Sequence, residues 1–101
     1  MAVGHVGVPD PPPVRQMEDG NVIVNVTGSS SGYGGAEQPI IVPTTFEVTN
    51  AVANLSKESE DGVKEIKIAY PPSGNNFLVE YKQVNPTDVW ELAFNWLAVS
   101  D

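Results

Sequence analysis

The chain carries few side chains that could perform catalysis. Its single histidine, His5, lies in a stretch rich in glycine and proline, and there is no cysteine. A general base must be held within hydrogen-bond reach of its target by a rigid frame, and a Ser-His-Asp arrangement here would have to use His5. Because a stretch of glycine and proline cannot provide that frame unaided, we expect that the protein is not an enzyme.

A second group of candidate residues is the acidic run Glu58, Glu60 and Asp61. Paired carboxylates can hydrolyse glycosidic bonds, and clustered oxygen ligands can hold calcium. The run also contains Lys57 and Ser59, which is typical of a solvated turn, and the ligand spacing of an EF-hand is absent. A zinc site based on cysteine is impossible in this chain. We therefore expect neither a metal nor any other cofactor.

Three glycines surround Tyr33 directly after a run of serines. A phosphate-binding loop would continue with Lys and then Ser or Thr at the start of a helix, and neither feature follows here. Residues 29–35 are therefore expected to form a flexible loop, in which Tyr33 is a candidate contact residue at the tip.

The formal net charge is −8, from 13 acidic and 5 basic side chains. Such an excess of negative charge repels phosphate backbones, so nucleic acid is not an expected partner. The acids are scattered along the chain, which favours a role in solubility over a dedicated acidic patch. An acidic inhibitor of a nucleic-acid-binding protein remains an alternative interpretation.

Residues 1–14 have neither a basic region nor a long apolar run, so we expect no signal peptide. No apolar stretch approaches the ~20 residues of a membrane span. The expected product is made in the cytoplasm and has no membrane contact.

Residues 1–20 form an extended arm rich in proline and glycine, separate from the body of the protein. Pro11 to Pro13 favour polyproline-like chain and exclude helix. Alone, the arm cannot bury enough apolar surface to offset the entropy of ordering it, so a partner must complete it. A PxxP-like ligand is one interpretation, and an assembly arm docked on a neighbouring subunit is the favoured one. The candidate contact residues are Val6, Val8, Pro9, Pro11, Pro12, Pro13, Val14 and Arg15.

Residues 21–101 are expected to form a single β-rich domain. After a turn at Gly20-Asn21, residues 21–28 alternate with Val22, Val24 and Val26 on one face. Residues 38–42 predict an edge strand or a crossing segment between two prolines, and residues 44–49 predict a strand with Phe46 and Val48 inward.

The clearest element is a hairpin. Residues 63–70 and 77–84 both alternate with period two and flank a turn-rich segment. One face of the hairpin is apolar, and the other can form cross-strand charge pairs among Lys64, Lys67, Glu80 and Lys82.

Residues 50–55 are ambiguous, and the C-terminal segment fits two periods. As a strand it places Trp90, Leu92, Phe94 and Trp96 on one face, and as a helix it begins near Pro86. Enrichment in aromatic and β-branched residues favours the strand. The expected fold is mainly β, a small antiparallel β-sandwich or barrel with an extended N-terminal arm and a C-terminal strand or short helix.

The chain is short, acidic, rich in predicted strands and free of cysteine, and it has an extended arm of proline and glycine. In these features it is similar to accessory proteins of bacteriophage virions, such as capsid decoration or cement proteins and small tail components. That likeness implies a non-enzymatic structural protein of the virion, which binds other virion subunits and itself. A small β-sandwich module that binds carbohydrate or peptide is the alternative. It would use Tyr33 and exposed aromatic rings, but Tyr70, Tyr81, Trp90 and Trp96 are expected to fill the core.

Overall fold

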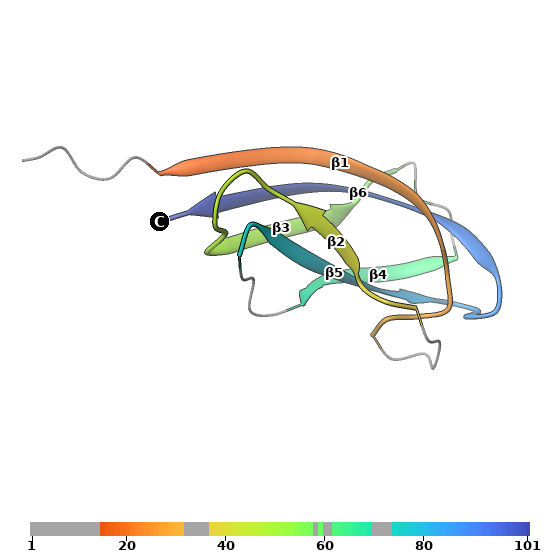
Figure 1. Cartoon of the computed structure of the whole chain (residues 1–101). Helices are drawn as coiled ribbons and strands as arrows, with labels where there is room; N and C mark the ends of the chain where they lie inside the picture. Colours follow the sequence, from red (N-terminus) through yellow and green to blue (C-terminus); the bar gives the residue numbers. More distant parts are fainter. Residues whose placement is uncertain (1–14, 32–36, 58, 60–61, 70–73) are drawn as a thin grey trace, which may run out of the picture.

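The computed structural model describes residues 15–31, 37–57, 59, 62–69 and 74–101. Within them the chain forms two three-stranded antiparallel sheets (Figure 1), which confirms a mainly β fold consistent with a small β-sandwich. The strand order is β1-β6-β3 in the first sheet and β2-β5-β4 in the second. The strands are β1 Gln16–Thr27, β2 Ile40–Pro43, β3 Asn50–Leu55, β4 Val63–Ala69, β5 Asn76–Gln83 and β6 Val89–Ser100.

The core lies between the inner faces of the two central strands, β5 and β6. Along β5 every second side chain is buried, from Phe77 to Gln83, as the pleat of a strand requires. The rings of Phe77 and Trp96 meet edge to face, with centroids 5.4 Å apart and planes at 64°. This aromatic pair joins one sheet to the other.

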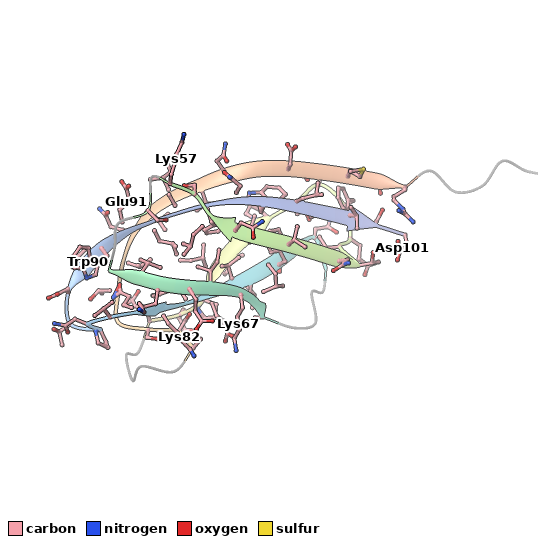
Figure 2. All side chains as sticks on the ribbon, turned by 180° about the vertical axis from the view of Figure 1, so that it is seen from behind. Lys57, Lys67, Lys82, Trp90, Glu91 and Asp101 are labelled. Carbon is pink, nitrogen blue, oxygen red and sulfur yellow. The ribbon has the colours of Figure 1, made fainter. Side chains whose placement is uncertain are left out.

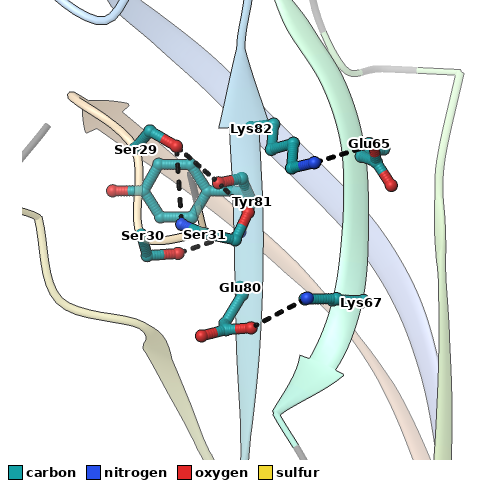
Figure 3. A network of polar contacts seen from close by, with 8 residues as sticks. All are labelled: Ser29, Ser30, Ser31, Glu65, Lys67, Glu80, Tyr81 and Lys82. Atoms are coloured by element: carbon teal, nitrogen blue, oxygen red, sulfur yellow. Dashed lines mark hydrogen bonds and ion pairs between the residues drawn. The ribbon is translucent and has the colours of Figure 1, made fainter. Parts of the chain in front are cut away.

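The predicted hairpin is confirmed as β4 and β5. Ile66 lies opposite Tyr81 on the inner face. On the outer face Lys67 pairs with Glu80 at 3.7 Å and Lys82 pairs with Glu65 at 3.6 Å (Figure 3). Two rows on the outer face of the second sheet are therefore occupied by ion pairs. Tyr70 lies outside the described residues.

The C-terminal segment is a strand, as the aromatic and β-branched residues indicated. β6 is the central strand of its sheet and pairs with both β1 and β3. Pro86 lies in a turn, in which the N–H of Asp88 donates to the carbonyl of Asn85. A helix here would leave β1 and β3 without a common partner.

The strand predicted at residues 44–49 is wrong, although Phe46 and Val48 are buried as expected. The N–H groups of Thr44 and Val48 bond to the carbonyls of Asn75 and Gly74, whereas that of Thr49 bonds to Val99. The segment thus passes from the second sheet to the first and cannot pair regularly with either. The ambiguous residues that follow form β3.

The turn predicted at Gly20-Asn21 is also wrong, because β1 continues through both residues. Gly20 lies opposite Trp96 in the register. A Cβ atom on Gly20 would come within 2.8 Å of the indole ring. The glycine therefore serves close packing against an aromatic ring inside a strand.

The first three serines of the loop predicted at residues 29–35 lie outside the strands, and their hydroxyls bond to the backbone of β5. β2 pairs with β5 only as far as Val79. Beyond that point the N–H of Tyr81 donates to Ser30 Oγ at 2.9 Å, and its carbonyl accepts from Ser29 and Ser31 (Figure 3). The hydroxyls thus take the place of the missing strand, because a buried backbone must find partners.

Ser59 has the same role at β6. The last residue pair between β3 and β6 is Leu55 with Phe94. The Ser59 hydroxyl then accepts from the N–H of Ala93 at 2.8 Å and donates to its carbonyl. The neighbouring candidates for carboxylate chemistry, Glu58, Glu60 and Asp61, lie outside the described residues.

Candidate docking surface

Most of the contact residues expected from the sequence lie outside the described residues, namely Val6, Val8, Pro9, Pro11, Pro12, Pro13, Val14 and Tyr33. Arg15 is described and lies one residue before β1. Its Nη2 atom is 3.6 Å from Asp101 Oδ1, and both side chains are largely exposed. The described part of the chain therefore begins at one end of the edge strand β1, beside Asp101 at the C-terminus of the chain (Figure 2).

The outward side of the β1-β6-β3 sheet is the strongest candidate for a binding surface, and we call it the open face. Alternation along the strands and the pairing register determine which side chains point outward. The open face comprises Met17, Asp19, Asn21 and Ile23 of β1, Asn50, Val52 and Asn54 of β3, and Asn95, Leu97 and Val99 of β6; Ala93, which points to the same side, is buried.

One end of the open face is mainly apolar. Val99 of the central strand lies opposite exposed Met17 of β1, and Leu97 lies opposite exposed Val52 of β3. On their other sides, Leu97 lies opposite Asp19 and Val99 lies opposite Asn50. The exposed fractions of Met17 and Val52 are 63% and 51%. Contiguous exposed apolar groups of this kind mark interaction sites, whereas single ones need no explanation.

The middle of the open face is a row of three asparagines. Asn95 of β6 lies directly opposite Asn21 of β1 on one side and opposite Asn54 of β3 on the other. All three are exposed. Asparagine is depleted in strands, so strand propensity does not account for the row. Each amide offers donors and an acceptor without charge, which suits recognition of polar groups.

A hollow of about 560 Å³ lies beside this row. Its lining includes Asn21, Asn95 and Ile23, with Ser56 and Lys57 at the end of β3. Lys57 and Glu91 lie toward this end of the sheet (Figure 2). A ligand could therefore enter this hollow as well as lie across the surface.

The two outer faces differ in charge. Of the open-face residues only Asp19 is ionisable, with Glu91 beyond Ala93 on β6. On the second sheet, ion pairs occupy two rows, although Ile41 of β2 is 65% exposed. The open face is therefore a surface of low charge on a strongly acidic protein.

The aromatic rings that a sugar-binding platform would use are largely internal. Tyr81 is fully buried and Trp96 is 9% exposed, which confirms the core interpretation for both. Trp90, which is labelled in Figure 2, is half-buried, and its ring lies against Gly62. Sequence reasoning did not find the open face, because its residues come from three separate strands.

Tyr81 provides a test of this core through pH. Its hydroxyl donates to the carbonyl of Thr27 at 3.2 Å. Burial raises the pKa of Tyr81 to about 12, and the negative charge of Glu37 adds to the rise. An unfolded tyrosine ionises near pH 10, so the folded state keeps a proton that the unfolded state loses.

We therefore expect the stability that depends on Tyr81 to be complete below about pH 10 and to fall as pH rises toward about 12. Urea denaturation across this interval should give a steeper loss for the wild type than for Tyr81→Phe. Parallel pH profiles for the two proteins would contradict the raised pKa.

In the part of the chain that the structure describes, no three His, Asp or Glu side chains gather in a way that could hold a metal ion. Nor does this part contain a helix with the length and apolar character needed to cross a membrane. Comparison with protein-family models, with curated proteins and with solved structures finds no match to this chain.

Proposed function

We propose that this chain is a non-enzymatic assembly protein that binds protein partners, including its own copies, through the open face. The observation that carries the proposal is the composition of that face. Three strands present apolar side chains beside neutral amides, with almost no charge, on a protein whose net charge is −8. Interface cores are depleted in charged residues in the same way.

The low charge has an energetic consequence for binding. A buried interface must remove water from every group that it covers, and unpaired charges carry the largest cost. Met17, Val52, Leu97 and Val99 lose only apolar hydration, which favours association by roughly 25 cal/mol per Å². The asparagine row can exchange water for hydrogen bonds with the partner, which gives orientation.

The setting that we propose is a bacteriophage virion, in which the protein would decorate the capsid or form a small part of the tail. The support is the general plan of the chain, a small acidic β domain without cysteine and with a proline-rich arm. In such a shell, many weak contacts are multiplied by repeated copies.

The test compares two matched substitutions in the full chain. Val52 and Ile41 are both β-branched, more than half exposed and placed on edge strands of different sheets. Val52→Glu adds a charge to the open face and should weaken self-association by about tenfold or more in sedimentation velocity. Ile41→Glu, on the other outer face, should leave self-association unchanged.

Circular dichroism on both variants establishes that each remains folded. A wild-type chain that stays monomeric over the whole concentration range, or two variants that associate equally well, would refute the proposed role of the open face.

A further inference from the structure

We infer that the open face of one copy binds residues 1–14 of a second copy of this chain. The inference rests on the proposed function and names the occupant of the same surface. It combines where the described chain begins, how far the preceding residues reach, and how the chemistry of the two parts matches.

The length of residues 1–14 determines how far they can reach from the point at which the described chain begins. Residues 1–14 precede Arg15, which lies at one end of β1 and two residues before Met17 of the open face. Fourteen extended residues span at most ~46–50 Å. A strand of 12 residues, the length of β1, spans ~40 Å. The segment is therefore long enough to follow the whole open face of a neighbouring copy.

The prolines in residues 1–14 favour one direction for this segment. Pro11, Pro12 and Pro13 stand just before the point at which the described chain begins. Consecutive prolines favour an extended chain. A return onto the open face of the same molecule would require a tight reversal at that point. Binding to a second copy requires none.

The third consideration is charge. Residues 1–15 hold one acid, Asp10, and one base, Arg15, so their side chains sum to zero with His5 neutral. Residues 16–101 then hold the other 12 acids and 4 lysines, which gives the full −8. Two copies repel each other through most of their surfaces. The N-terminal segment and the open face are the two parts of low charge that can meet.

The fourth consideration is the match of chemical groups. The segment alternates small apolar side chains with glycine and proline, and its valines are Val3, Val6, Val8 and Val14. These suit the apolar end of the open face at Met17, Val52 and Leu97. An extended chain leaves its backbone N–H and C=O groups without internal partners. The amides of Asn21, Asn54 and Asn95 can donate to and accept from such groups.

A face-to-face dimer fits the same surface less well. It would bring Asp19 and Glu91 of both copies into one interface, and each asparagine row would meet only another row of its own kind or apolar groups. Like charges enclosed in an interface oppose association. The N-terminal segment brings one carboxylate, Asp10, and can place it outside the covered area.

The experiment uses complementation between two full-length variants. Val6→Asp/Val8→Asp has an altered segment and an intact open face, whereas Val52→Glu has an intact segment and an altered face. Each variant alone should lose at least about tenfold in self-association. A mixture of the two should regain association near the wild-type Kd, because one intact segment can still bind one intact face. Ile41→Glu is the control that should associate normally in every combination.

The possible failures are distinguishable. If Val52→Glu abolishes association and Val6→Asp/Val8→Asp does not, the open face is an interface but the segment is not its occupant, and this inference is overturned alone. If the segment variant abolishes association and the mixture does not recover, the segment binds a different surface, which also overturns it. If no variant changes association, the proposed function fails as well.

Discussion

Phe77→Ala is expected to lower the free energy of unfolding by about 4 kcal/mol. Phe77 is fully buried near the start of β5, the central strand of its sheet, and its ring meets Trp96 of the opposite sheet edge to face. Truncation removes both the apolar burial of the ring and its contact with the indole, and it leaves a cavity between two sheets that cannot collapse fully. Domains of this size have a total stability of about 5–15 kcal/mol, so much of it would be lost.

Chemical denaturation followed by tryptophan fluorescence measures this effect. Phe77→Leu serves as the matched control, because it keeps most of the apolar volume and removes the aromatic contact. We expect it to cost clearly less than the alanine variant. If both cost less than about 1 kcal/mol, the aromatic pair is not what joins the two sheets.

Gly62→Ala is expected to cost about 3 kcal/mol, a large effect for the addition of one methyl group. A Cβ atom at position 62 would lie 2.1 Å from the Trp90 ring, well inside van der Waals contact. The indole would have to move away as a whole, and the loss of its packing adds to the strain. The backbone is also constrained here, since the carbonyl of Gly62 accepts from the N–H of Val84 at 2.8 Å.

A double-mutant cycle identifies the cause. In a Trp90→Ala background the space above residue 62 is open, so Gly62→Ala should then cost less than about 1 kcal/mol. If Gly62→Ala lowers the free energy of unfolding equally in the two backgrounds, the requirement for glycine at this position comes from its backbone conformation and not from its contact with Trp90.

These two substitutions also separate stability from binding. Phe77 and Gly62 lie beneath the surface, whereas Val52 projects from it. We expect core variants to shift the denaturation midpoint and to leave the proposed contact between residues 1–14 and the open face intact in the molecules that remain folded. Open-face variants should do the opposite, because their side chains contribute little to the core.

The hairpin could be predicted because its information is local. Ile66, Ile68, Val79 and Tyr81 recur with period two on either side of a turn-rich segment, and only one pairing places all of them inward. Residues 44–49 carried the same kind of pattern and form no strand. Period two reports which side chains are buried, but it does not report whether the backbone has a neighbouring strand.

The serines illustrate a second limit. Serine is common in loops, and Ser29, Ser30 and Ser59 do lie in loops. Their hydroxyls nonetheless complete the edges of β5 and β6 where the partner strands end. The neighbouring sequence does not distinguish such a serine from one that is only solvated, because the backbone group to which its hydroxyl bonds lies many residues away in the chain.

The amino-acid sequence alone determined the β character of the chain and the inward side of most strands. Tertiary structure alone decided that Asn21, Asn54 and Asn95 stand in one row, with an apolar surface beside them. The reason is physical. Alternation is a property of each strand by itself, whereas the register between strands depends on contacts between residues far apart in the chain, and a shift of one residue would turn a different set of side chains outward.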